Sequence, residues 1–184
     1  MGYPTVAYFD KNIVKRTKEN LKNSSIKNDF THLLNSLFGL IIIPNQMKIQ
    51  GRRSLRLFDE KLSNYKELDF FKGEQTFLDE QNDGRFIEIT ASKFTHKSLK
   101  YEDLKFSDFI NHLRNAIAHN GIRPIKDPGN GNWYGIILRN YKKDKDISKW
   151  NDKYYLQLLL SQAELKSLCD FLTNKYLEEF KSVE

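Results

Sequence analysis

Apolar residues recur at helical spacing near the start of the chain. They predict two helices, over residues 10–23 and 30–43, with Asp29 as the N-cap of the second and Pro44 as its end. Because residues 37–43 are apolar on every side, we expect the second helix to lie inside the core.

The region that follows is less regular. Residues 50–80 are rich in charge, and a short helix over 55–65 is compatible with their pattern. Residues 81–84, with the sequence QNDG, are a strong turn signal, and the apolar positions within 86–89 fit a strand or a helix equally well. The role of residues 50–86 stays open at this point.

The clearest helix is predicted over residues 103–120, with starts near Tyr101 and at Ser107 both possible. Its apolar positions fall on one side of a helical wheel, and Asn120-Gly121 then supplies the left-handed conformation that often ends a helix. The apolar side consists of Phe109, Ile110, Leu113, Ala116 and Ile117.

The last part of the chain combines strand and helix signals. Two apolar, aromatic-rich runs within residues 133–160 predict a β-hairpin. Ser161 and Glu164 have the spacing of a capping box, which predicts a final helix over residues 162–181. Together the elements predict a single domain, 1–184, of the mainly α class: a helical bundle with a small β-hairpin before the C-terminal helix.

Composition and charge are those of a globular protein with a modest basic bias. The chain has 30 lysines and arginines against 24 acidic residues, and 39% of its residues are hydrophobic. A basic surface favours contact with polyanions such as RNA or DNA. Cys169 is the only cysteine, so no intrachain disulfide can form, and the longest apolar run is about half the length of a membrane helix. We expect a cytoplasmic protein that does not associate with membranes.

Several kinds of active site are excluded because their motifs are absent. The chain has no HExxH, no paired CxxC, no Walker phosphate loop, no GxGxxG and no GxSxG elbow. We therefore predict no metal and no cofactor. Among the histidines, His32 in an apolar helix and His96 in a polar loop are expected to have structural or surface roles.

His112 and His119 differ, because both lie with Arg114 on the clearest predicted helix. At about 100° per residue, Arg114 and His119 border the polar face of this helix from opposite sides. Only small or polar residues lie between them, among them Asn115 and Ala118. This arrangement leaves room for a phosphate or for a second copy of the same helix.

Residues 114–119, with the sequence RNAIAH, resemble the R-x4-6-H motif of the HEPN superfamily. These are helical-bundle proteins that include many metal-independent ribonuclease toxins of prokaryotic defence systems. Asn115 takes the place of the polar residue that commonly follows the arginine. Residues 30–44 are also similar to the core helix of HEPN nucleases from a plasmid-borne family. The resemblance covers most of residues 10–180 and implies a HEPN-like helical bundle.

The resemblance also implies an activity. In the resembled ribonucleases two protomers pack their motif helices together and cut RNA without metal in a shared cleft. The implied protein is a homodimeric, metal-independent endoribonuclease that acts on RNA as a toxin or as an abortive-infection effector of phage defence. An antitoxin or regulatory protein would then be encoded separately.

Roles for four residues follow from the same resemblance. The RNA 2′-hydroxyl attacks the adjacent phosphorus, with His119 as general acid or base, because imidazole with its ordinary pKa of about 6.5 suits proton transfer at neutral pH. Arg114 stabilises the charge that develops on the phosphate. Asn115 and His112 are implied as substrate-binding or supporting residues.

Two other interpretations fit the same residues. A HEPN-like domain can bind RNA, a nucleotide or a partner protein, or serve only to dimerise, without cutting. An arginine and a histidine near the C-terminal end of a helix can also act solely on the helix dipole and its last carbonyls. The sequence leaves all three interpretations open.

Overall fold

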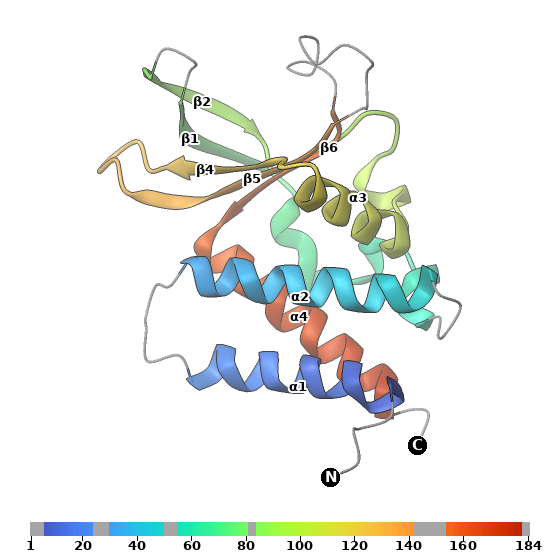
Figure 1. Ribbon diagram of the computed structural model, residues 1–184. Coiled ribbons are helices and arrows are strands. Elements are labelled where there is room, and N and C mark those ends of the chain that lie inside the picture. The colour runs from blue at the N-terminus through green and yellow to red at the C-terminus, as the bar shows by residue number, and fades with distance from the viewer. Residues whose placement is uncertain (1–5, 24–29, 50–54, 81–83, 142–153, 182–184) are drawn as a thin grey trace.

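The computed structural model describes residues 6–23, 30–49, 55–80, 84–141 and 154–181. The predicted cap at Asp29 and most of the turn predicted over 81–84 lie outside the described residues. The helices and strands keep the labels of Figure 1 below.

The described residues form four α-helices: α1 (Val6–Asn23), α2 (Phe30–Ile49), α3 (Phe106–Ala118) and α4 (Gln162–Lys181). Helices α1, α2 and α4 pack on one another, and α3 packs against α2 and the sheet. Short 3-10 turns precede the sheet and α3: η1 (Arg56–Asp59), η2 (Leu62–Asn64), η3 (Lys66–Phe71) and η4 (Tyr101–Asp103). The segment predicted as a short helix over 55–65 therefore forms 3-10 turns.

A six-stranded antiparallel sheet lies beside the helices (Figure 1). Its order is β2-β1-β4-β5-β6-β3. The prediction of a mainly α bundle with a small β-hairpin is therefore wrong. The expected hairpin exists as β5 and β6, but it forms the middle of a larger sheet. The strands are β1 (Glu74–Glu80), β2 (Phe86–Ser92), β3 (Phe94–His96), β4 (Ile122–Lys126), β5 (Trp133–Tyr141) and β6 (Tyr154–Ser161).

Strands β1, β3 and β4 were missed because they lack the apolar alternation that predicts a strand from sequence, whereas the segment of β2 fits a strand or a helix equally well. Most side chains of β1 and β2 are polar or partly exposed, and Phe77 is the buried exception in β1. Strand β3 has only three residues, and Pro124 within β4 argues against a strand. Backbone pairing forms these strands: β1 pairs with β2 and β4 with β5 as neighbours in sequence, whereas β1–β4 and β3–β6 join segments far apart in the chain, which local side-chain patterns do not reveal.

The core has two parts on opposite faces of the sheet. The larger lies between the helices and one face of β5 and β6, where Leu138 and Leu158 are buried. The smaller lies on the other face and includes Phe77, Ile125 and Ile137. Strands β5 and β6 are therefore buried on both faces, which explains their continuous apolar runs.

Of two helix boundaries predicted from the sequence, the structure confirms one and contradicts the other. The capping box at the start of α4 is confirmed, because the Glu164 backbone N–H donates to Ser161 Oγ at 3.2 Å and the Ser161 N–H donates to the Glu164 carboxylate at 2.9 Å. The prediction that Pro44 ends the second helix is wrong, since α2 continues to Ile49. The helix continues because burial of Leu37 and Ile41 in the core offsets the loss of the backbone hydrogen bond that Pro44 cannot donate.

Candidate functional site

The site predicted from sequence lies along the outer side of α3. The inner side of this helix is formed by Phe109, Ile110 and Leu113, which are fully buried against the core. Helix α3 begins at Phe106, close to the later of the two possible starts, and there the Phe106 N–H donates to the Glu60 carbonyl at 2.7 Å. With the apolar side buried, the polar side of α3 faces outward.

The C-terminal end of α3 is a Schellman motif. Asn120 adopts the left-handed conformation, with φ of 54°, and its N–H donates to the Ile117 carbonyl. The Gly121 N–H reaches back to the Ala116 carbonyl at 2.7 Å. Asn120 therefore takes the left-handed position, and Gly121 is the next residue of the motif.

Gly121 fixes the end of α3 to strand β5. An added Cβ at this position would overlap the carbonyl oxygen of Arg139, so only glycine fits without movement. The Arg139 N–H also donates to the Gly121 carbonyl at 2.6 Å. These contacts hold the last turn of α3, and with it His119, in a defined place beside the sheet.

The three motif residues differ in how far their side chains are exposed to solvent. His119 is the C-cap residue of α3 and is exposed, as is its neighbour Ala118. Arg114 is half-buried, and its Nη2 donates to Asn115 Oδ1 at 2.8 Å. Within the described part of the chain, the buried Nε–H of Arg114 has no hydrogen-bond partner. Arg114 and Asn115 are thus joined to each other, while His119 faces solvent one turn further on.

His112 is held in a network that links α3 to three strands. Its Nε2 lies 3.3 Å from Nε2 of His96 on β3, and its Nδ1 lies 2.6 Å from the side-chain amide of Asn140 on β5. The ring of Tyr155 on β6 lies beside it, with a centroid distance of 6.2 Å. The side chain of His112 therefore contacts the sheet and has different neighbours from those of Arg114 and His119, although all three lie on one helix.

The hydrogen bonds assign the protons of this network. His96 Nδ1 accepts the backbone N–H groups of Ser98 and Leu99, at 3.2 and 3.0 Å, so its ring proton sits on Nε2. His96 Nε2–H then donates to His112 Nε2, which places the proton of His112 on Nδ1. The amide nitrogen of Asn140 lies 2.6 Å from His112 Nδ1, and rotation of this amide by 180° would place its oxygen there, where it accepts the Nδ1 proton.

The surroundings favour the neutral form of both rings. Burial lowers the pKa of His96 below its ordinary value, and the carboxylate of Asp108 opposes this shift. Burial also lowers the pKa of His112, His96 lowers it further, and Asp108 again opposes the shift. Both imidazoles are therefore expected to be uncharged at neutral pH.

The two facing nitrogens do not make a metal site. Their separation is close to the ~3.3 Å expected for two ligands on one tetrahedral zinc ion. However, His96 Nε2 carries the ring proton and has no lone pair to offer, because Nδ1 is already the acceptor. Within the described ranges, no group of three potential metal ligands occurs.

His96, Asn140 and Tyr155 were missed as neighbours of the motif helix. The sequence placed His96 in a polar loop, whereas it lies on strand β3. Tyr155 is the extra residue of an irregularity in β6, since Asn140 pairs with Leu156 and Tyr141 with Tyr154. No local signal marks these residues, because they come together only when β3, β5 and β6 pair.

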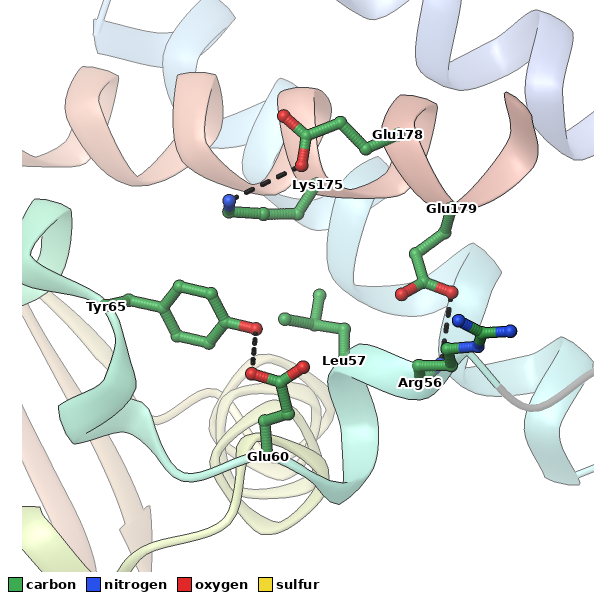
Figure 2. Close-up of a pocket in the computed structure, with 7 residues that line it drawn as sticks. All are labelled: Arg56, Leu57, Glu60, Tyr65, Lys175, Glu178 and Glu179. Carbon is green, nitrogen blue, oxygen red and sulfur yellow. Dashed lines mark hydrogen bonds and ion pairs between the residues drawn. The ribbon is translucent and has the colours of Figure 1, made fainter. Parts of the chain in front are cut away.

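A separate pocket lies at the other end of α3, against α4 (Figure 2). Its volume is about 320 Å³, and Tyr65 Oη donates to Glu60 at 2.7 Å across its floor. The Glu60 carbonyl receives the first N–H of α3, so the pocket sits at the opposite end of that helix from His119. None of the motif residues lines it. The lining residues are Arg56, Leu57, Glu60, Tyr65, Lys175, Glu178 and Glu179.

Comparison with known proteins gives one match. The family model described as HEPN pEK499 p136 matches residues 1–182. No curated protein and no solved structure matches the chain. None of the helices in the described part of the chain is long and apolar enough to cross a membrane.

Proposed function

Since the chain belongs to the HEPN pEK499 p136 family, whose domain type suggests a nuclease or toxin function, we propose that it is a metal-independent endoribonuclease. Arg114 and His119 are the proposed catalytic residues, and RNA is the proposed substrate. The observation that carries the proposal is the geometry at the end of α3. A half-buried arginine with an unpaired Nε–H lies one turn before an exposed histidine.

The unpaired Nε–H of Arg114 can donate a hydrogen bond to an acceptor on a bound ligand. A buried donor without a partner costs about 1–3 kcal/mol, so a phosphate oxygen that reached it would recover this cost. Asn115 holds the guanidinium by one nitrogen and leaves the remaining donors for such an anion. In this proposal Arg114 stabilises the negative charge that develops on the phosphate during cleavage.

His119 supplies the proton transfer. The RNA 2′-hydroxyl attacks the adjacent phosphorus, and the bond from phosphorus to the 5′-oxygen breaks. Imidazole can accept a proton from the nucleophile or give one to the leaving oxygen. The products are a 2′,3′-cyclic phosphate and a 5′-hydroxyl end.

The complete site is proposed to form between two copies of the chain. Ala118 is small and exposed beside His119, so a second α3 could approach closely there. Arg114 contacts Asn115 rather than His119 within one chain, and a partner helix would bring a second arginine and a second histidine into the same cleft. Homodimerisation is thus part of the proposal.

Asn115 and His112 have supporting roles in this scheme. Asn115 orients Arg114 through the 2.8 Å hydrogen bond. His112 is a positioning residue, because its contacts with His96 and Asn140 hold α3 against the sheet. The biological role that fits a ribonuclease of this family is that of a toxin or phage-defence effector, controlled by a separately encoded antitoxin or regulator.

The test is incubation of purified protein with total RNA in excess EDTA. Cleavage by wild type and by the exposed-arginine control Arg56→Ala, but not by the Arg114→Ala, His119→Ala double variant, is the expected result. Product ends are checked with a phosphatase and a kinase, and the dimer by light scattering. If wild type and the double variant are both folded and neither cuts RNA, the alternative of a non-catalytic RNA-binding or dimerisation module replaces the nuclease.

A further inference from the structure

One end of the sheet extends away from the helices (Figure 1), and two strands that start there begin with an exposed aromatic residue. Trp133 at the start of β5 is 61% exposed, and Phe86 at the start of β2 is 40% exposed. Soluble proteins tend to cover such side chains. Their position at one end of the sheet therefore calls for an explanation.

A lysine lies between the two aromatic side chains. Lys126 at the end of β4 is directly opposite Trp133 in the β4–β5 pair, so both side chains point to the same face. The Nζ of Lys126 lies 4.1 Å from the centre of the Phe86 ring. Trp133, Lys126 and Phe86 form one strip across the sheet, which we call the tip strip.

We propose that the tip strip binds single-stranded RNA by stacking bases on Trp133 and Phe86 while Lys126 contacts a phosphate. This inference rests on the proposed ribonuclease function, and it names where the RNA runs outside the cleavage site. Alternation of aromatic rings with a cation is the usual composition of surfaces that bind single strands without strict sequence preference.

The tip strip is connected to the motif helix by strand β4. Ile122 at the start of β4 follows Gly121, which holds the end of α3, and Ile122 packs against the main core. Four residue steps along the strand, about 13 Å, lead from Ile122 to Lys126 on the same face. At about 3.4 Å per stacked base this distance corresponds to roughly four nucleotides. One RNA strand can therefore reach both places.

Charge limits the path of the RNA across this face. Glu80 and Glu88 lie on the same face towards the β2 edge, opposite Phe86 and Leu78 respectively. Because Phe86 itself lies at this edge, their carboxylates keep phosphates away from its surroundings and leave only its ring for base stacking. The phosphates are therefore expected to follow the β4 side of the tip strip, where Lys126 lies.

The test measures RNA binding separately from cleavage. All variants are made in the His119→Ala background, so that RNA is not cut, and binding of a fluorescein-labelled 12-nucleotide RNA is followed by anisotropy at fixed salt. Trp133→Ala is expected to raise Kd by about five- to 150-fold, the range corresponding to one stacked base. Trp133→Phe should restore most of the affinity. The matched control is Leu99→Ala, because Leu99 is also 40% exposed but lies away from the tip strip.

A cleavage assay then locates the tip strip relative to the site. With His119 restored, Trp133→Ala should raise KM for the 12-nucleotide RNA and leave the cleavage of a dinucleotide unaffected, because a dinucleotide cannot reach the strip. Equal Kd values for Trp133→Ala and Leu99→Ala would overturn the proposal, as would a change of oligomeric state caused by Trp133→Ala alone. Loss of affinity in a protein that never cuts RNA would instead contradict the proposed nuclease and leave the tip strip standing.

Discussion

Two histidines on α3, seven residues and about 10 Å apart, have opposite surroundings. His112 is enclosed by β3, β5 and β6, with hydrogen-bond partners on both ring nitrogens. His119 is exposed at the C-cap, and its backbone N–H completes the last turn. Both ring nitrogens of His112 are bonded to groups within the fold, so neither is directed at a substrate. The comparison therefore gives His112 a structural role and leaves the side chain of His119 accessible, as its proposed catalytic role requires.

The two ends also depend on different kinds of contact. The His112 end is held by side-chain hydrogen bonds to His96 and Asn140. The His119 end is held by backbone groups of Gly121 and Arg139, which leave its side chain free to act. A side chain that is placed by its backbone can be precisely located and still accessible, which suits the proposed role of His119.

The largest effect that tests this comparison is on RNA cleavage. His119→Ala should lower the rate by about 100- to 10,000-fold, the usual contribution of a general acid or base. His112→Ala should have a smaller effect, through the placement of α3 only. Single-turnover cleavage of a defined RNA measures both. Equal losses from the two substitutions would break the comparison.

The next largest effect is on folding, at the Gly121 contact. Gly121→Ala should reduce the free energy of unfolding by about 3 kcal/mol, because its Cβ overlaps the Arg139 carbonyl oxygen. Gly39→Ala is the matched control: it adds the same methyl group inside α2 with no atom within 4 Å, and should change stability by at most about 1 kcal/mol in the favourable direction. Urea unfolding monitored by circular dichroism measures both. Similar curves for the two variants would show that the end of α3 is not fixed by Gly121.

The smallest effect is on the pH dependence of stability. At pH 8, His112→Ala should lower the free energy of unfolding by about 2 kcal/mol, because it leaves the His96 donor and the Asn140 amide without partners. His119→Ala should lower it by less than about 0.5 kcal/mol.

The folded state holds the pKa of His96 and His112 below the ordinary value of about 6.5. Below that pH the unfolded chain binds more protons, so wild-type stability falls as the pH drops from about 6.5.

Removal of the network should flatten this decline. The His96→Ala, His112→Ala double variant should lose less stability than wild type between pH 7 and pH 5, while His119→Ala should follow the wild-type slope. Urea midpoints at matched pH values supply the measurement. A wild-type slope in the double variant would show that the two buried rings are not the groups that take up protons.

The sequence by itself determined the elements whose signals lie in neighbouring residues. The range of α4 and its capping box followed from Ser161 and Glu164, and the buried side of α3 followed from its helical spacing. The family was also predicted from residues 114–119, since a short motif on one helix turn needs no tertiary contact to be recognised.

Only the tertiary structure decided the class of the fold and the surroundings of the two histidines. Strands β1 and β4 are held by backbone pairing that polar sequences also permit, so their side chains predicted no sheet, and those of β2 left strand and helix open. His96 meets His112, and Gly121 meets Arg139, across 16 and 18 positions of sequence. Such contacts arise when separate elements pack together, and the pattern within either element does not contain them.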